Sequence, residues 1–261
     1  MELGLRGKKA LITGASKGIG RACAEVLAEE GCDIALVSRT AADLEKARSE
    51  IAGKYNVGVR VFALDLSDGA NVDKLAAECT DIDILVNNAG AIPGGDIDAI
   101  TEERWRTAWD LKVFGYVNMT RCFYAQMRER RRGVIVNILG SAGENPDFDY
   151  VAGSSGNASL MAFTRAMGGT APRDNLRVVG INPGPVMTER LITLTKTRAR
   201  DTLGDESRWE ELMKGQPFGR AAKPEEIAAM VAFVASGRVS GYTTGSIITI
   251  DGGATSRRSV L

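Results

Sequence analysis

The chain has 261 residues, with 33 basic side chains, 33 acidic side chains and no histidine. This length can bury the core of one large α/β domain without requiring a second domain. The balanced charge gives no overall field that would attract nucleic acid or acidic lipid, so neither partner is expected. The absence of histidine excludes His-containing catalytic triads and His-ligated metal sites, and no metal site is predicted.

The cysteine pattern and the lengths of the apolar runs indicate the cellular compartment of the protein. The four cysteines are far apart, without Cys-x-x-Cys spacing, and we interpret them as buried thiols in a reducing environment. The first residues contain no apolar stretch typical of a signal peptide, and no apolar run reaches membrane-spanning length. We therefore expect a cytoplasmic protein that does not associate with membranes.

Short, continuous apolar runs predict strands that are buried on both faces. These runs cover residues 9–13, 33–38, 59–63, 82–86, 134–139, 177–181 and 247–250. Amphipathic stretches predict helices at residues 18–30, 42–55, 69–79, 102–131, 154–168 and 224–236. This alternation predicts one doubly wound α/β domain over residues 1–261, with a parallel sheet and helices on both of its faces.

Residues 189–219 depart from the alternation, because they are polar and lack a clear apolar period. In a doubly wound sheet they would emerge at the carboxyl end of the sixth strand, beside the ligand crevice. One interpretation is a surface insertion. We favour a lid over the site, since long ordered segments at that edge are usually functional. Its leucines could cover an acyl or ring substrate, and its cations could meet a carboxylate or phosphate or lie on a solvated helix face.

The first predicted strand and helix are joined by the turn Thr-Gly-Ala-Ser-Lys-Gly-Ile-Gly. Glycine permits close backbone approach at positions 14 and 18, and at position 20 it lets the helix pack against the strand. The free N–H groups at the helix start would then bind a pyrophosphate. The predicted cofactor-binding residues of this turn are Gly14, Ser16, Lys17, Gly18, Ile19 and Gly20.

The end of the second predicted strand bears on which dinucleotide is bound. A carboxylate at position 38 would accept the hydroxyls of the adenosine ribose, but the sequence has Ser38 followed by Arg39. Together with Lys17, two cations and no carboxylate suit a 2′-phosphate. We therefore favour NADP(H), with NAD(H) left open; the alternative is that both cations are solvated at the surface.

Five motifs together resemble the short-chain dehydrogenase/reductase family, in order and at matching spacings over essentially the whole chain. They are residues 13–20, Asp65-Leu66, residues 87–90 (Asn-Asn-Ala-Gly), residues 182–188 (Asn-Pro-Gly-Pro-Val-Met-Thr) and residues 251–253 (Asp-Gly-Gly). The resemblance implies a seven-stranded Rossmann-type sheet and a homo-oligomer, either a tetramer or a dimer. It also implies further cofactor-binding residues: Asp65 and Leu66 at the adenine, Asn88, Ala89 and Gly90 at the ribose, Ile138, and Pro183, Gly184, Val186 and Thr188 at the nicotinamide.

The family's catalytic set is an Asn, a Ser, a Tyr and a Lys four residues after the Tyr. Alignment on the flanking motifs places Lys112 at the Asn and Gly140 at the Ser. It places Gly153 at the Tyr and Asn157 at the Lys, so all four positions differ. No lysine occurs between Lys112 and Lys196, so no shift of register restores the Tyr–Lys pair.

The residues found at and near these four positions suggest replacements for the family's catalytic side chains. Lys112 and Asn157 are a reciprocal exchange, and we hypothesise that Lys112 supplies positive charge near the nicotinamide ribose, steadied by Asn157. The alternative is that Lys112 extends along a helix surface. Tyr150 and Ser141 are the candidates for proton donation, although Tyr150 could equally pack beneath its loop and Ser141 could only orient a carbonyl.

These observations favour an NADP(H)-linked oxidoreductase that acts on a small carbonyl or alcohol with unorthodox catalytic residues. One alternative is a lyase or isomerase that retains the dinucleotide as part of its structure. Another is a catalytically silent sensor or partner subunit that binds NADP(H). All three predict cofactor binding, so turnover of NADPH is what separates them.

Overall fold

The computed structural model describes residues 1–256, which are built around a seven-stranded parallel sheet of order β3-β2-β1-β4-β5-β6-β7. The strands are β1 (Lys9–Thr13), β2 (Asp33–Ser38), β3 (Val59–Ala63), β4 (Ile84–Asn87), β5 (Val134–Ile138), β6 (Arg177–Pro183) and β7 (Ile247–Ile250). The predicted doubly wound sheet is therefore confirmed.

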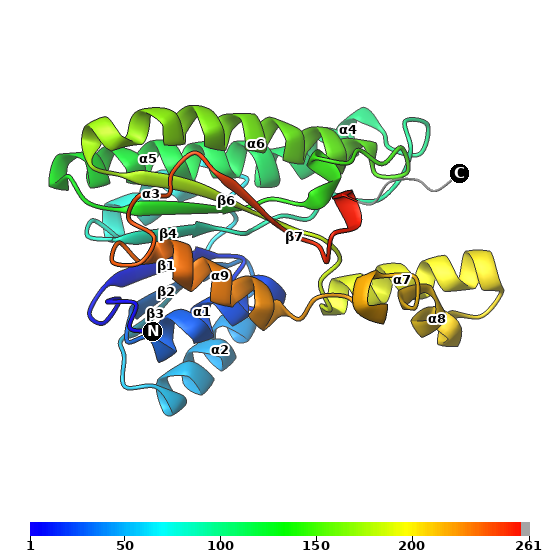
Figure 1. Cartoon of the computed structure of the whole chain (residues 1–261), viewed down its shortest axis with the longest axis horizontal. Helices are drawn as coiled ribbons and strands as arrows, with labels where there is room; N and C mark the ends of the chain where they lie inside the picture. Colours follow the sequence, from blue (N-terminus) through cyan, green and yellow to red (C-terminus); the bar gives the residue numbers. More distant parts are fainter. Residues whose placement is uncertain (257–261) are drawn as a thin grey trace.

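Helices cover both faces of this sheet (Figure 1). They are α1 (Gly18–Glu29), α2 (Ala41–Lys54), α3 (Gly69–Glu78), α4 (Glu102–Trp109), α5 (Gly115–Arg130), α6 (Val151–Thr170), α7 (Glu189–Leu203), α8 (Trp209–Met213) and α9 (Pro224–Ala235). Neighbouring residues of β1 belong to different cores: Ile12 packs with the cluster of α1, α2 and α9, and Leu11 with the cluster of α3 and α5. Burial on both faces explains why the strand sequences are continuously apolar.

Three strands differ from their predicted bounds. β4 begins two residues later and ends one residue later than expected, and the carbonyl of Ile82 accepts a hydrogen bond from Arg130 at 2.7 Å. β5 ends at Ile138, one residue earlier than expected. β6 continues to Pro183, two residues further than expected, because Pro183 is in register with Ile250 of β7. The sheet is therefore longer at the edge from which the predicted ligand site opens.

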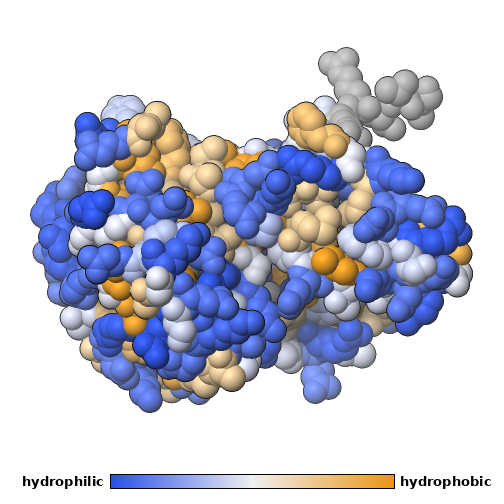
Figure 2. Space-filling view, turned by 90° about the horizontal axis from the view of Figure 1, so that it is seen from below, coloured by the Kyte–Doolittle hydropathy of each residue, from blue (hydrophilic) through white to orange (hydrophobic). Residues whose placement is uncertain are grey.

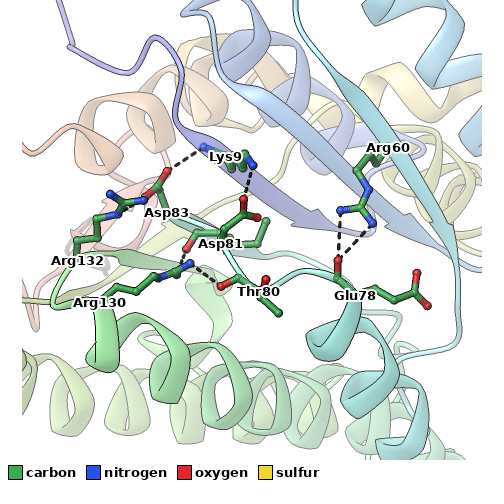
Figure 3. A network of polar contacts seen from close by, with 9 residues as sticks. Lys9, Arg60, Glu78, Thr80, Asp81, Asp83, Arg130 and Arg132 are labelled. Carbon is green, nitrogen blue, oxygen red and sulfur yellow. Dashed lines mark hydrogen bonds and ion pairs between the residues drawn. The ribbon is translucent and has the colours of Figure 1, made fainter.

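A polar network ties the segment between α3 and β4 to the amino end of the sheet (Figure 3). Arg130, at the end of α5, also donates to the carbonyl of Thr80 at 2.6 Å. The Nε of Arg132 lies 3.0 Å from a carboxylate oxygen of Asp83, whose other oxygen accepts from the backbone N–H of Lys9 at 3.1 Å. Since ligands bind at the opposite edge of such a sheet, this network has a structural role.

The helix predicted over residues 102–131 is interrupted. A π-helical segment, Asp110–Phe114, separates α4 from α5, and the N–H of Gly115 reaches back five residues to the carbonyl of Asp110. The extra residue in this wide turn displaces the following side chains from an ordinary helical register. Such segments occur frequently at functional sites, and this one carries Lys112.

Residues 189–219 contain α7, α8 and two short 3-10 helices. The hydroxyl of Thr188 caps α7 by accepting from the N–H of Leu191 at 3.2 Å. In Figure 1, α7 and α8 project to the right, beyond the carboxyl ends of the central strands, and in Figure 2 apolar side chains are visible between this block and the main body. None of the helices within residues 1–256 combines the length and apolarity needed to cross a bilayer.

The cysteines are unpaired thiols, but they are not all buried as expected. Cys23, Cys32 and Cys79 lie in the interior, whereas Cys122 is partly exposed on α5. The thiol of Cys122 faces Asp73 of α3 at 3.4 Å. Burial raises the pKa of Cys23 and of Cys32 to about 12, so these thiols are unreactive at neutral pH.

Candidate active site

A cleft of about 580 Å³ opens at the carboxyl edge of the sheet, below α7. The predicted residues that line it are Gly14, Lys17, Gly18, Ile19, Asn88, Ala89, Gly90, Lys112, Ile138, Ser141, Tyr150, Asn157, Pro183, Gly184, Val186 and Thr188. The cleft thus brings the four candidate catalytic side chains together with the Gly-rich turn. The remaining predicted residues lie elsewhere: Ser16 and Gly20 in the turn itself, Ser38 and Arg39 at the end of β2, and Asp65 and Leu66 after β3.

A second hollow, of about 430 Å³, continues toward the predicted adenosine end. Arg39 and Asp65 line it, together with Ala91, which is flanked along the chain by two residues of the main cleft. Leu66 differs from this pair because its side chain is buried in the core below α5 and not exposed to a ligand. The family resemblance placed Leu66 at the adenine; in this structure only its backbone could make that contact.

The Gly-rich turn is built tightly enough to exclude side chains. Gly14 and Gly18 adopt positive φ values of 64° and 58°, in the left-handed region that favours glycine. A Cβ on Gly20 would lie 2.5 Å from the amide nitrogen of Asn88 and would overlap the carbonyl of Gly14. That amide nitrogen donates to the carbonyl of Thr13 at 3.0 Å, so Asn88 fixes the turn from the end of β4.

The predicted binding site for the 2′-phosphate, made of Lys17, Ser38 and Arg39, differs in one respect from the expectation. Lys17 is not a free cation, because its Nζ lies 3.4 Å from a carboxylate oxygen of Asp43 and 3.8 Å from one of Glu189. Arg39 has no ion pair within the described part of the chain and is exposed. The hydroxyl of Ser38 is buried without a hydrogen-bond partner in that same part. A buried hydroxyl that lacks a partner, beside a guanidinium, fits a phosphorylated or free adenosine ribose.

Lys112 is buried, with 7% of its surface exposed, and does not extend along the helix surface. Its Nζ donates to the carbonyl of Ile138 at 2.6 Å and to the hydroxyl of Tyr116 at 2.8 Å. Burial, assisted by the positive charge of Arg190, lowers the pKa of Lys112 from 10.5 to about 7. The amine can therefore gain or lose a proton at neutral pH.

Asn157 is also buried, but it does not hold Lys112 as hypothesised. The Nζ of Lys112 is directed to the end of β5, where the Ile138 carbonyl is available. The side-chain oxygen of Asn157 has no hydrogen-bond partner among residues 1–256, although the residue lines the cleft. It is therefore free to accept a hydrogen bond from a bound molecule.

Tyr150 is the N-cap of α6, which begins three residues earlier than predicted. It is therefore attached to a helix end and held in place by the N–H of Gly95, which donates to the carbonyl of Asp149 at 2.7 Å. The Tyr150 ring lies over Gly153, where a Cβ would overlap it. Burial raises the pKa of Tyr150, opposed by the charge of Arg190, so its hydroxyl is protonated at neutral pH.

Three glycines of the site share one feature: the space that a side chain would need is filled by a larger neighbour. The pairs are Gly90 with Lys112, Gly140 with Asn157, and Gly153 with Tyr150. The closest approach of an added Cβ would be 2.6 Å to Cδ of Lys112 and 2.8 Å to Nδ2 of Asn157. The unusual side chains are thus packed as partners of these glycines.

Comparison with known proteins agrees with this architecture. The family model described as short chain dehydrogenase matches residues 8–199. The chain belongs to the short-chain dehydrogenase family. It is 33% identical over 264 residues to 2,3-dihydro-2,3-dihydroxybenzoate dehydrogenase of Bacillus subtilis (strain 168), and the match covers 97% of each chain. The resemblance inferred from the motifs is confirmed.

Solved structures of the family superpose closely on this short-chain dehydrogenase. L-sorbose reductase from Gluconobacter frateurii, in complex with NADPH and L-sorbose, gives a TM-score of 0.92 at 33% identity, covering 99% of this chain and 100% of that one. NAD⁺-bound xylitol dehydrogenase gives 0.87 at 26% identity, covering 96% and 100%.

Two site residues of this short-chain dehydrogenase were missed by the sequence reasoning. Tyr116, a hydrogen-bond partner of Lys112, is four residues away in the chain, and that spacing could have indicated it. Arg190 was noted only among the cations of the lid. Its guanidinium donates to the carbonyl of Gly90 at 3.1 Å and to that of Ile92, which joins α7 to the segment after β4.

Proposed function

We propose that this short-chain dehydrogenase is an NADP(H)-linked oxidoreductase that interconverts a small carbonyl compound and its alcohol. The supporting observation is a buried lysine whose pKa lies at about 7, in the same cleft as a protonated tyrosine and the dinucleotide turn. The similarity to an L-sorbose reductase that binds NADPH supports the same type of reaction. Residues 189–219 are proposed to act as the lid, and assembly as a homo-oligomer and a cytoplasmic location are also part of this proposal.

The residues of the cleft, together with those at the end of β2 beside the second hollow, fit a dinucleotide. The N–H groups of the turn around Gly14 and Gly18 would bind the pyrophosphate, and Ser38 with Arg39 would receive the 2′-phosphate. Thr188 would lie at the nicotinamide end. When bound, the reduced cofactor supplies a hydride to a carbonyl carbon.

The side chains of the inner cleft would donate the proton and stabilise the charge that develops on the substrate oxygen. The Tyr150 hydroxyl donates its proton to the carbonyl oxygen, and Ser141 orients that oxygen with a hydrogen bond. The protonated Lys112, whose side chain is buried, stabilises the negative charge that develops nearby. The unpartnered side-chain oxygen of Asn157 accepts a hydrogen bond from a hydroxyl of the bound molecule.

The loss of NADPH absorbance with a panel of aldehydes, ketones and quinones tests this function. We expect turnover of at least one compound, and we expect Tyr150→Phe to lower kcat about 10²-fold or more without changing NADPH affinity. Tight NADPH binding without turnover of any compound would support the silent sensor instead. Conversion of a substrate with no change in NADPH would support a lyase or isomerase.

Ser38→Asp tests the cofactor preference. The new carboxylate would repel a 2′-phosphate and accept the ribose hydroxyls, so the NADPH dissociation constant should rise at least about tenfold while that of NADH falls. Calorimetric titration with both cofactors measures the ratio. Ser49→Asp, which adds the same charge at an exposed position of α2, is the control and should leave the ratio unchanged. An unaltered ratio in Ser38→Asp would refute the assignment of the 2′-phosphate to this strand end.

A further inference from the structure

The charges that line the cleft are unevenly distributed. Its basic residues are Lys17, Lys112 and Arg190, and its one acidic residue is Glu189. Glu189 lies 3.8 Å from Lys17, at the Gly-rich turn. Within residues 1–256, neither Lys112 nor Arg190 has a carboxylate within ion-pair distance. The inner end of the cleft is therefore positive and lacks a counter-ion from the described protein.

Arg190 is exposed to solvent at this end of the cleft, and hydrogen bonds hold its guanidinium in a fixed orientation. It is the second residue of α7, and its two hydrogen bonds go to the carbonyls of Gly90 and Ile92 across the cleft. A guanidinium has five N–H donors, so two carbonyls leave donors available. Carbonyls also carry no net charge, so they orient the guanidinium without neutralising it.

Arg190 lies close to Lys112 in the fold, because its guanidinium donates to the carbonyl of Gly90 and Gly90 packs directly against the Lys112 side chain. Arg190, Lys112 and Tyr150 line the same cleft, so the guanidinium lies near the candidate catalytic groups. The remaining wall is apolar and includes Ile92, Leu191 and Leu194. A molecule bound here would meet an apolar surface, a proton donor and one oriented cation.

On the basis of the proposed function, we propose that the substrate carries a carboxylate, which the guanidinium of Arg190 binds while the substrate carbonyl faces Tyr150 and Ser141. The planar fork of Arg190 matches a carboxylate in geometry. A carboxylate is favoured over a phosphate because this end of the cleft offers one permanent cation, and a phosphate carries nearly two negative charges. The substrate class is therefore small oxo acids and hydroxy acids.

Substrate pairs that differ only in this charge test the proposal. The wild-type protein should reduce 2-oxo and 3-oxo acids with a higher kcat/KM than their methyl esters. In Arg190→Gln the acid-to-ester ratio of kcat/KM should fall at least about tenfold, through KM for the acid. Arg190→Lys, which keeps the charge but loses the fork, should fall between the two. Arg198→Gln, exposed on the same helix, should leave the ratio unchanged.

A binding measurement separates failure of this inference from failure of the proposed function. Benzoate titrated into the protein loaded with oxidised NADP should bind more tightly than benzamide, and Arg190→Gln should abolish the difference, with NADP affinity and melting temperature as checks on folding. If the protein binds benzoate more tightly than benzamide but reduces no carbonyl compound, oxo acids included, the proposed function fails and the carboxylate site stands. Equal binding of benzoate and benzamide, or a preference for esters in turnover, would overturn the inference.

Discussion

Lys112→Met is expected to lower kcat/KM for carbonyl reduction about 10²-fold or more and, at the same time, to raise the melting temperature. The lysine is buried in the folded protein without an acidic partner, which makes its charged form costly. Methionine has a similar length, so it can occupy the same path over Gly90 without leaving a cavity. Stabilisation of about 1–3 kcal/mol is expected from removing the buried amine.

The lowered pKa of Lys112 predicts how the difference in stability between the parent and Lys112→Met changes with pH. The pKa of Lys112 is about 7 in the folded protein and 10.5 in the unfolded chain, so between these values the unfolded chain binds more protons. The stability of the parent protein should therefore rise with pH between about 7 and 10.5 relative to that of Lys112→Met. The stability gain of the variant should be largest below pH 7.

The titration of Lys112 should also affect activity, which should fall as the pH rises, whereas stability rises. Reduction is proposed to use the protonated amine, so kcat/KM should fall as the pH rises through about 7, and this titration should be absent from Lys112→Met. Thermal melts and pH profiles of both proteins measure the two effects. Lys46→Met, at an exposed position of α2, is the control and should change neither. A variant that retains the pH profile of the parent would disprove the role of Lys112.

Gly20→Ala is expected to abolish measurable NADPH binding and to lower the free energy of unfolding by about 1–3 kcal/mol. The new methyl group would lie 2.5 Å from the side-chain nitrogen of Asn88 and overlap the carbonyl of Gly14. The carbonyl of Gly14 belongs to the turn and the Asn88 side chain fixes the turn by hydrogen bonds to Thr13 and Gly14, so relief of the overlap requires the turn to open. Calorimetric titration with NADPH and chemical denaturation measure the two effects.

A Gly→Ala substitution at a position with free space controls for the effect of the added methyl group. Gly53 lies in α2, and a Cβ there would have nothing within 4 Å. Gly53→Ala should therefore leave NADPH binding unchanged and raise stability by about 0.5–1 kcal/mol, because alanine is the better helix former. Normal NADPH affinity in Gly20→Ala would mean that the turn does not hold the cofactor.

Local patterns predicted most of the sheet but not the irregular helices. The bounds of β1, β2, β3 and β7 agree with their apolar runs. β1 and β2 are buried over most of their length, which leaves a clear local signal, whereas the edge strands β3 and β7 are only partly buried. The π-helical segment has no such signal, because it depends on a hydrogen bond that shifts by one residue. The start of α6 depends on contact with Gly95, which lies far away in the sequence.

Of the site residues, too, only those fixed by local sequence could be predicted. Glycines of the turn could be recognised because their spacing reflects a fixed backbone geometry. The partners of Lys112 could not, since the direction of a long side chain depends on packing between elements that meet only in the fold. For the same reason the carboxylates beside Lys17 were missed: Asp43 and Glu189 come from two different helices.

Two of the glycine pairs, Gly140 with Asn157 and Gly153 with Tyr150, limit which substitutions could restore the usual family pattern. A tyrosine at position 153 would collide with Tyr150, and a serine at position 140 would crowd Asn157. As packed in this structure, Asn157 and Tyr150 therefore require glycine at positions 140 and 153. Restoring only the serine at position 140 or only the tyrosine at position 153 would therefore overpack the pocket, so a return to the ordinary catalytic set needs paired changes at these positions.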